Sequence, residues 1–278
     1  MNRPAATIAL AVLAGALAAP AGAQLSTDLV SRSEFRVCAD PHNLPFSNDK
    51  QAGFENKIAE LIAKDLNEPV GYTWFPQTVG FVRNTLLADR CDVVMGTVAA
   101  GEMMDDTNPY YRSAYMIVTR ADDNIAATSL ADSALAGKRF GLIAGTPPTD
   151  LLLKHKLLAQ TASYSLLIDT RNESPSRQML QDLIDKEIDV ALLWGPYAGY
   201  FIAEEHLPLH AALLASEPNG PKLDYYIAMG VRPGETAWRR TLNRSILKHQ
   251  DEITRILLDY HVPLLDAQNR LITDASPH

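Results

Sequence analysis

The chain has 278 residues, 47% of them hydrophobic, and a formal net charge of −8 from 25 basic and 33 acidic side chains. This length and apolar content suffice for one large domain or two smaller ones to bury a core without help from a metal or a disulfide. The negative charge argues against nucleic acids and anionic membranes as partners.

The first 24 residues are organised like a cleavable secretory signal. Arg3 precedes an Ala/Leu/Val run, and a small-residue Ala-Gly-Ala pattern precedes Gln24. The apolar run is shorter and richer in alanine than the roughly 20 strongly apolar residues of a membrane anchor. We therefore expect a signal peptide at 1–23, cleaved near Ala23/Gln24, and a mature periplasmic protein with no transmembrane segment.

The mature chain shows two series of alternating strands and helices. In the first series we expect strands at 35–39, 72–75 and 92–96, and helices near 55–66 and 79–89. In the second we expect strands at 140–143, 165–168 and 189–193, and helices near 149–159, 175–187 and 196–205. Such alternation is typical of parallel sheets flanked by helices.

Two further apolar segments, 114–119 and 225–231, flank the second series, and we interpret them as paired crossovers between two lobes. A long helical stretch from 235 to about 260 has an apolar face and would complete the first lobe. The predicted fold class is α/β with two lobes, each a mostly parallel sheet flanked by helices. The predicted divisions are a signal peptide at 1–23, lobe 1 at 24–119, lobe 2 at 120–222, and the completion of lobe 1 with C-terminal helices at 223–278.

The loop after the first predicted strand is an indication of a ligand site. Residues 40–50 hold two prolines, two asparagines and a serine between a buried strand and an amphipathic helix. Ligands of open α/β sheets bind at such loops, beyond the carboxyl ends of strands. Asp40 is either a cleft residue or a turn residue that caps this loop. Glu55 either lines the cleft or only stabilises the first helical turn.

The two cysteines, Cys38 and Cys91, lie in the exported part of the chain, where disulfides persist. Cys38 is inside one predicted strand and Cys91 just precedes another, so their Cα separation could miss the range that a bridge requires. A disulfide and a pair of buried thiols are both open.

Metal-binding and catalytic motifs are absent from the sequence. The seven histidines are scattered, and the carboxylates Glu102, Asp105 and Asp106 lack the spacing of a calcium loop, so we expect no metal and no other cofactor. The chain has no G-x-S-x-G, H-E-x-x-H, phosphate-loop or C-x-x-C motif, so we expect no enzyme. A dehydratase would need a cleft acid and base, for which Asp40 and Glu55 are the candidates.

Several segments carry a family resemblance: RVCADPHNLPFS, GFENKIAELIAKDL, FVRNTL, RCDVVMG, NPYYRSAY and DVALLWGPYAGYF. With two α/β lobes and two crossovers, the mature chain resembles the periplasmic solute-binding proteins of the type II fold, solute-binding protein family 3, over nearly all of 34–260. More narrowly, these segments resemble the MxaJ/XoxJ-type accessory proteins that are encoded beside quinoprotein methanol dehydrogenases.

The chain departs from the amino-acid binders of that fold at both of their charged anchors. Counting back from Pro109 and Tyr110 places Ala100 where those binders carry an arginine for the ligand carboxylate. Trp194 stands where they carry an aspartate for the ligand amino group. A site without both anchors loses on the order of several kcal/mol of charged hydrogen bonds, so we do not expect an amino-acid ligand.

By position in the fold, the resemblance implies an aromatic and polar set of cleft residues: Asp40, Asn43, Phe46, Glu55, Thr97, Thr146, Trp194 and Tyr197. Thr146 precedes a helix whose N-terminus faces anions in binders of this fold. Pro147 and Pro148 lack N–H donors, which weakens that expectation here.

The resemblance implies a periplasmic accessory protein that binds, and helps to assemble or activate, a PQQ-dependent methanol dehydrogenase, in particular its apo form. The c-type cytochrome of that enzyme is a further candidate partner. The Trp-Gly-Pro-Tyr run suits either cleft lining or an exposed apolar contact surface. The contact candidates are Trp194, Pro196, Tyr197, Tyr200 and Phe201. The alternative function is a solute-binding protein of an ABC transporter with a small, weakly charged ligand.

Overall fold

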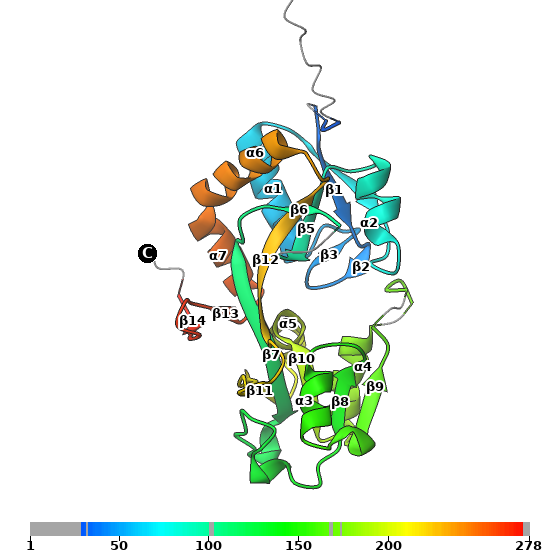
Figure 1. Ribbon diagram of the computed structural model, residues 1–278, viewed down its shortest axis with the longest axis vertical. Coiled ribbons are helices and arrows are strands. Elements are labelled where there is room, and N and C mark those ends of the chain that lie inside the picture. Colours follow the sequence, from blue (N-terminus) through cyan, green and yellow to red (C-terminus); the bar gives the residue numbers. More distant parts are fainter. Residues whose placement is uncertain (1–28, 32, 100–102, 167–168, 173, 275–278) are drawn as a thin grey trace, which may run out of the picture.

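The computed structural model describes residues 29–31, 33–99, 103–166, 169–172 and 174–274. The predicted signal peptide and Ala100 lie outside these ranges. Two lobes are stacked along the long axis of the molecule, and extended strands run from one lobe into the other (Figure 1). None of the described helices has the length and apolar character needed to cross a membrane.

A single ten-stranded sheet passes through both lobes in the order β4-β1-β5-β12-β7-β10-β8-β9, with β6 on β12 and β11 on β7. In lobe 1 the parallel strands are β1 (Phe35–Ala39), β4 (Val70–Trp74) and β5 (Val93–Val98). In lobe 2 they are β8 (Phe140–Ile143), β9 (Thr161–Tyr164) and β10 (Val190–Trp194). The predicted two-lobed α/β fold is confirmed.

The two crossovers are the antiparallel strands β7 (Tyr111–Arg120) and β12 (Asp224–Val231), paired with Ala114 opposite Asp224. The rest of β7 continues into lobe 2, where it pairs with β10 and with β11 (Leu209–Leu213). β12 continues into lobe 1, where it pairs with β5 and with β6 (Asp105–Asp106). The prediction of paired crossovers is therefore confirmed.

Side chains of the lobe 1 strands alternate between two apolar layers, as the two-residue period of a strand requires. Phe35 and Val37 face a core cluster that includes α1 (Phe54–Leu66), α6 (Thr236–Lys248) and α7 (Gln250–Asp259). Cys38 and Val94 face a smaller cluster beneath α2 (Phe81–Asn84). Because apolar layers cover both faces of the sheet, the sequences of its buried strands are nearly continuous apolar runs.

Two helices of lobe 1 differ from the sequence prediction. The stretch 235–260 is two helices, because the backbone leaves the helical conformation at His249, with φ −111° and ψ 18°. The expected helix at 79–89 is wrong: α2 has one turn and a 3-10 turn follows it at Leu86–Ala88. Between them Thr85 leaves the helical region, and its hydroxyl donates to the Phe81 carbonyl at 2.7 Å.

Lobe 2 contains α3 (Pro148–Lys154), α4 (Pro175–Ile184) and α5 (Gly195–Glu204). The predicted strand at 165–168 is wrong, because the edge strand β9 is Thr161–Tyr164, in register with β8. Ser165 and Leu166 are exposed after it, and 167–168 lie outside the described residues. The remaining short strands are β2 (His42–Asn43), β3 (Ser47–Asn48), β13 (Leu264–Leu265) and β14 (Leu271–Ile272).

Cys38 and Cys91 form a disulfide with a Cα separation of 5.4 Å. Cys38 lies on β1, and Cys91 precedes the neighbouring parallel strand β5, which pairs with β1 through Val37 and Val93. The register of these two strands brings the cysteines within bridging range. Of the two states that the sequence left open, the structure contains the bridge.

Candidate functional site

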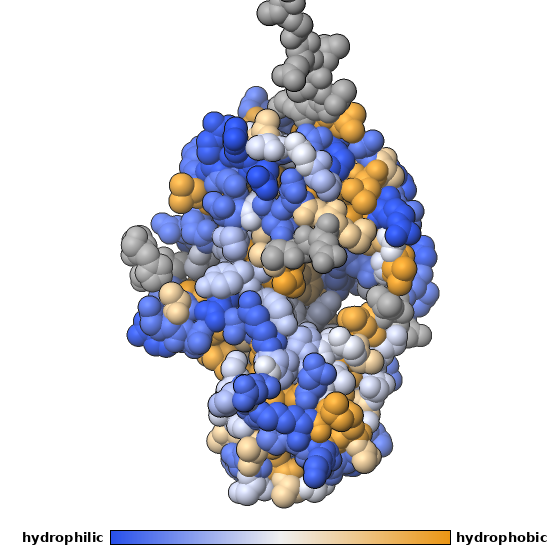
Figure 2. Space-filling view, viewed as in Figure 1, coloured by the Kyte–Doolittle hydropathy of each residue, from blue (hydrophilic) through white to orange (hydrophobic). Residues whose placement is uncertain are grey.

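A cavity of about 590 Å³ lies between the lobes, and both lobes contribute side chains to it. The surface is visibly hollowed between the upper and lower halves of the molecule (Figure 2). The residues on its walls come from the loop after β1, from the start of α1, from β5, from both crossovers, and from the ends of β8 and β10. This is the crevice beyond strand ends where α/β sheets bind ligands.

The structure brings most of the predicted cleft residues together at this cavity. The ones that line it are Asn43, Phe46, Glu55, Thr97, Thr146, Trp194 and Tyr197. Asp40 is fully buried behind the wall and does not line the cavity.

Asp40 instead accepts hydrogen bonds from three parts of the chain. The backbone N–H of His42 donates to it at 2.8 Å, as expected of a residue that caps its own loop. The N–H of Gln77 donates at 2.7 Å. The Thr170 hydroxyl, which belongs to lobe 2, lies 2.7 and 2.9 Å from the two carboxylate oxygens. Asp40 therefore both caps its loop and joins the lobes.

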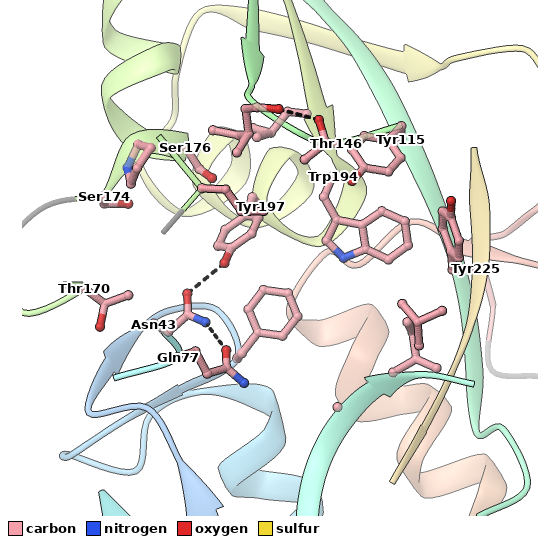
Figure 3. A pocket seen from close by; sticks show the side chains of 18 of the residues that line it. Asn43, Gln77, Tyr115, Thr146, Thr170, Ser174, Ser176, Trp194, Tyr197 and Tyr225 are labelled. Carbon is pink, nitrogen blue, oxygen red and sulfur yellow. Dashed lines mark hydrogen bonds between the residues drawn. The ribbon is translucent and has the colours of Figure 1, made fainter. Parts of the chain in front are cut away.

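A second polar chain also joins the lobes. The Tyr197 hydroxyl, on α5 of lobe 2, donates to Asn43 Oδ1 at 2.8 Å, and Asn43 Nδ2 donates to Gln77 Oε1 at 2.9 Å (Figure 3). Gln77 is thus common to both connections, through its backbone and its side chain. These hydrogen bonds hold the lobes together across the cavity.

Glu55 is the one carboxylic acid among the described residues that line the cavity. It is 6% exposed and lies on the first turn of α1, where its N–H donates to the Phe46 carbonyl at 2.9 Å. A Cβ on Gly96 would overlap Glu55 Oε1, so the glycine on β5 makes room for the carboxyl group. Burial, followed by repulsion from the Asp40 carboxylate, raises the pKa of Glu55 to about 8.

Aromatic rings form much of the remaining wall. Phe46 contacts Tyr197 with ring centroids 5.0 Å apart, and Trp194 contacts Tyr115 and Tyr225 at 5.3 and 6.1 Å. Figure 3 shows Trp194 beside both tyrosines, on the side of the crossovers. Tyr115 and Tyr225 are not in the predicted set of cleft residues. A period of two along the crossovers would have indicated them, because it places alternate residues on one face.

The backbone at the start of α3 and the Thr146 hydroxyl do not present free donors to the cavity. The Thr146 hydroxyl donates to the Ile143 carbonyl at 2.6 Å, and the N–H of Thr149 donates to the Thr146 carbonyl at 2.9 Å. Pro147 and Pro148 have no N–H to offer. These contacts argue against an anion at this helix.

The expectation of an exposed apolar patch on α5 is wrong. Among the contact candidates, Pro196 and Phe201 are buried, and Trp194, Tyr197 and Tyr200 are only partly exposed.

The reason is the close approach of α5 to the segment that follows α7. A Cβ on Gly199 would overlap the His261 carbonyl oxygen, so only a glycine permits this contact. Tyr200 stacks on Tyr260 with ring centroids 6.0 Å apart. The apolar side chains of α5 are therefore used inside the molecule: Phe201 packs in the core of lobe 2, Tyr197 lines the cavity and Tyr200 packs on Tyr260.

Within the described ranges, no group of three or more His, Cys, Asp or Glu side chains could hold a metal ion. The two dehydratase candidates are unequally placed, because Asp40 is held by three donors and does not reach the cavity. The cavity is of the size that encloses small molecules.

Three comparisons place this geometry among known proteins. The family model of the bacterial extracellular solute-binding proteins, family 3, matches residues 35–261. Protein MoxJ of Paracoccus denitrificans is 28% identical over 264 residues, covering 90% of this chain and 93% of that protein.

Among solved structures, the periplasmic binding protein XoxJ from Methylobacterium extorquens AM1 is 39% identical, with a TM-score of 0.72, and the match covers 84% of this chain and 99% of that one. MxaJ from Methlophaga aminisulfidivorans MPT is 23% identical, with a TM-score of 0.70, over 83% of this chain and 100% of that one, which shows a shared fold.

Proposed function

The chain belongs to the bacterial extracellular solute-binding proteins, family 3, as a protein of the MxaJ/XoxJ type, and on that premise we propose that it is a periplasmic accessory protein of methanol oxidation. In this role it binds a PQQ-dependent methanol dehydrogenase and helps to assemble or activate it.

The observation that carries the proposal is the likeness to XoxJ, which at 39% identity extends over 99% of that periplasmic binding protein. The composition of the cavity supports a departure from ordinary solute carriage. None of the described residues that line it is lysine or arginine, so they offer no basic side chain to an amino-acid carboxylate. The predicted signal at 1–23 supports a periplasmic location.

The proposed partner is the dehydrogenase in its apo form, with its c-type cytochrome as a further candidate. Trp194 and Tyr197 stay candidate contacts only for a conformation in which the lobes have separated, because both face the cavity here.

The test is a calorimetric titration of the mature protein into purified dehydrogenase, in apo and metal-loaded forms. We expect saturable binding, stronger to the apo form. An amino-acid-binding protein of the same fold, titrated identically, controls for nonspecific heat. Absence of saturable binding to both forms would remove the accessory role.

A second candidate function is favoured by the cavity itself. A volume of about 590 Å³, closed by hydrogen bonds between lobes, suits a solute-binding protein of an ABC transporter with a small, weakly charged ligand. Small-angle scattering separates the two candidates. Compaction on adding a metabolite, without dehydrogenase binding, would favour the transporter.

A further inference from the structure

The charges at the interlobe cavity are unbalanced. Its described lining includes Glu55 and His42 as titratable acid and base, and no lysine or arginine. A second carboxylate, Asp40, lies close enough to Glu55 to raise its pKa. None of the residues at 100–102, 167–168 and 173 is lysine or arginine. Arg171 interacts electrostatically with Asp40 but does not line the cavity. A buried carboxyl group with no lysine or arginine on the described wall favours a positively charged occupant.

Among the two carboxyl groups, Glu55 is the one to which none of the described residues donates a hydrogen bond. Asp40 receives hydrogen bonds from two backbone N–H groups and from Thr170. By contrast, no hydrogen bond from a described residue reaches the Glu55 carboxyl, although the residue is 6% exposed and lines the cavity. An occupant that donates to this carboxyl group would supply the hydrogen bond that the described residues do not provide.

The walls around this carboxyl are suited to a cation rather than to a sugar or an anion. Tyr111 and Tyr197 lie within electrostatic range of Glu55, and Phe46 packs against the Tyr197 ring. Trp194 offers its indole to the same cavity. Aromatic faces attract ammonium groups within about 6 Å of the ring centroid, and tryptophan does so most strongly.

We propose that the interlobe cavity binds a small organic ammonium ion, with the Glu55 carboxylate as its charge partner and the rings of Phe46, Trp194 and Tyr197 as its walls. The proposal does not depend on a dehydrogenase partner. It also predicts a proton balance: Glu55, protonated in the empty cavity at neutral pH, loses its proton to the buffer when the cation binds. Affinity should therefore rise with pH up to about 8.

The test is isothermal titration of the mature protein with choline, trimethylammonium and methylammonium. The neutral control is 3,3-dimethylbutan-1-ol, which has the shape of choline with carbon in place of nitrogen. We expect saturable binding of at least one cation, at least about tenfold tighter than the alcohol. At pH 7, titration in two buffers of different ionisation enthalpy should show release of up to one proton per cation.

Three variants assign the roles. Glu55→Gln should weaken cation binding at least about tenfold and abolish proton release, while leaving the alcohol unaffected. Glu60→Gln, on the same helix but exposed and paired with Lys57, is the matched control and should change neither. Trp194→Leu should weaken cation binding several-fold, because it keeps an apolar wall but removes the indole face. Thermal unfolding checks that each variant is folded.

The proposal is overturned if none of the three cations binds at millimolar concentration, or if the alcohol binds as tightly as choline. The proposal would also be overturned if the cation bound without proton release and with the same affinity in Glu55→Gln, because the carboxylate would then have no part in recognition. A lysine side chain of a partner protein offers the same chemistry as a free ion. If choline displaces a bound partner protein, the occupant is a lysine side chain of that partner. If choline binds while the partner stays bound, the occupant is a free ammonium ion.

Discussion

The Thr170 hydroxyl lies 2.7 and 2.9 Å from the two carboxylate oxygens of Asp40, although 130 residues separate them in the chain. Asp40 is fully buried in lobe 1, at the carboxyl end of β1, and Thr170 belongs to the loop between β9 and α4 of lobe 2. A charged hydrogen bond therefore connects the two lobes at the edge of the cavity, in addition to the one between Tyr197 and Asn43.

Removing the Thr170 hydroxyl should shift the lobes toward an open arrangement. Thr170→Val keeps the shape of the side chain but loses a hydrogen bond to a carboxylate, which is worth roughly 1.5–3 kcal/mol. That corresponds to at least a tenfold change in the ratio of closed to open molecules. Small-angle scattering should report a larger radius of gyration. Thr254→Val, whose hydroxyl donates within α7, is the control and should leave the radius unchanged.

The stability of the protein should fall with rising pH because of Glu55. Its pKa is raised from 4.5 to about 8, so between these values the unfolded chain releases a proton that the folded protein keeps. The stabilisation is fully present below pH 4.5 and is lost as the pH rises through 8. Glu55→Gln should remove this slope, so the difference in unfolding free energy between the two proteins changes by on the order of 5 kcal/mol across this window. Urea unfolding at several pH values measures it, and identical slopes would refute the assignment.

Asp92 should be among the most sensitive positions of lobe 1. Its carboxylate, 1% exposed, accepts hydrogen bonds from Arg36 at 2.7 Å and from Arg232 at 2.6 Å. Asp92→Asn removes the nearest charge partner of the buried Arg232 guanidinium and leaves it only the longer contacts with Asp89 and Glu235 among the described ion pairs, and we expect a loss of about 3–5 kcal/mol in urea unfolding. Asp89→Asn tests the specificity of this effect. Asp89 is half exposed and lies 3.4 Å from Arg232, so a loss below about 1 kcal/mol is expected there.

Opening the disulfide should destabilise lobe 1. The bridge joins residues 53 positions apart, and removing a link of this kind costs about 2–5 kcal/mol, mainly because the unfolded chain gains freedom. A double variant, Cys38→Ala with Cys91→Ala, should unfold at lower urea concentration than the oxidised protein. Reductant should lower the midpoint of the original protein and leave that of the variant where it is. Equal midpoints for all samples would show that the bridge contributes little.

The parts of the fold that the sequence predicted are those with strong local patterns. Burial explains these patterns: β1, β8 and β10 are apolar runs because they lie in the core, and α1 has an apolar stripe on the face that packs against the sheet. The prediction failed at 165–168, where an apolar run continues past the end of β9, since only pairing with β8 determines where that strand stops.

The candidate site shows a similar division. Position in the fold was enough to place Phe46 and Trp194 on the cavity wall. It left open whether Asp40 reaches the cavity or caps its loop, because the hydrogen bonds from Gln77 and Thr170 come from distant segments. The sequence could not decide between a disulfide and two free thiols either, because the strand register determines whether Cys38 and Cys91 come close enough to bond.

The pairing of Ala114 with Asp224 has a consequence for how the two halves of the cavity can vary. The chain leaves for lobe 2 and returns from it at adjacent points of one ladder, so lobe 2 is an insertion whose two ends are neighbours. We predict that lobe 2 can be exchanged as a unit, by grafting residues 121–222 from a relative onto the same two strands. We expect such a chimera to unfold cooperatively and to keep the Glu55 wall while acquiring a foreign wall opposite it. The two sides of the site are constrained together where they touch, as Asp40 is by Thr170 and Asn43 by Tyr197.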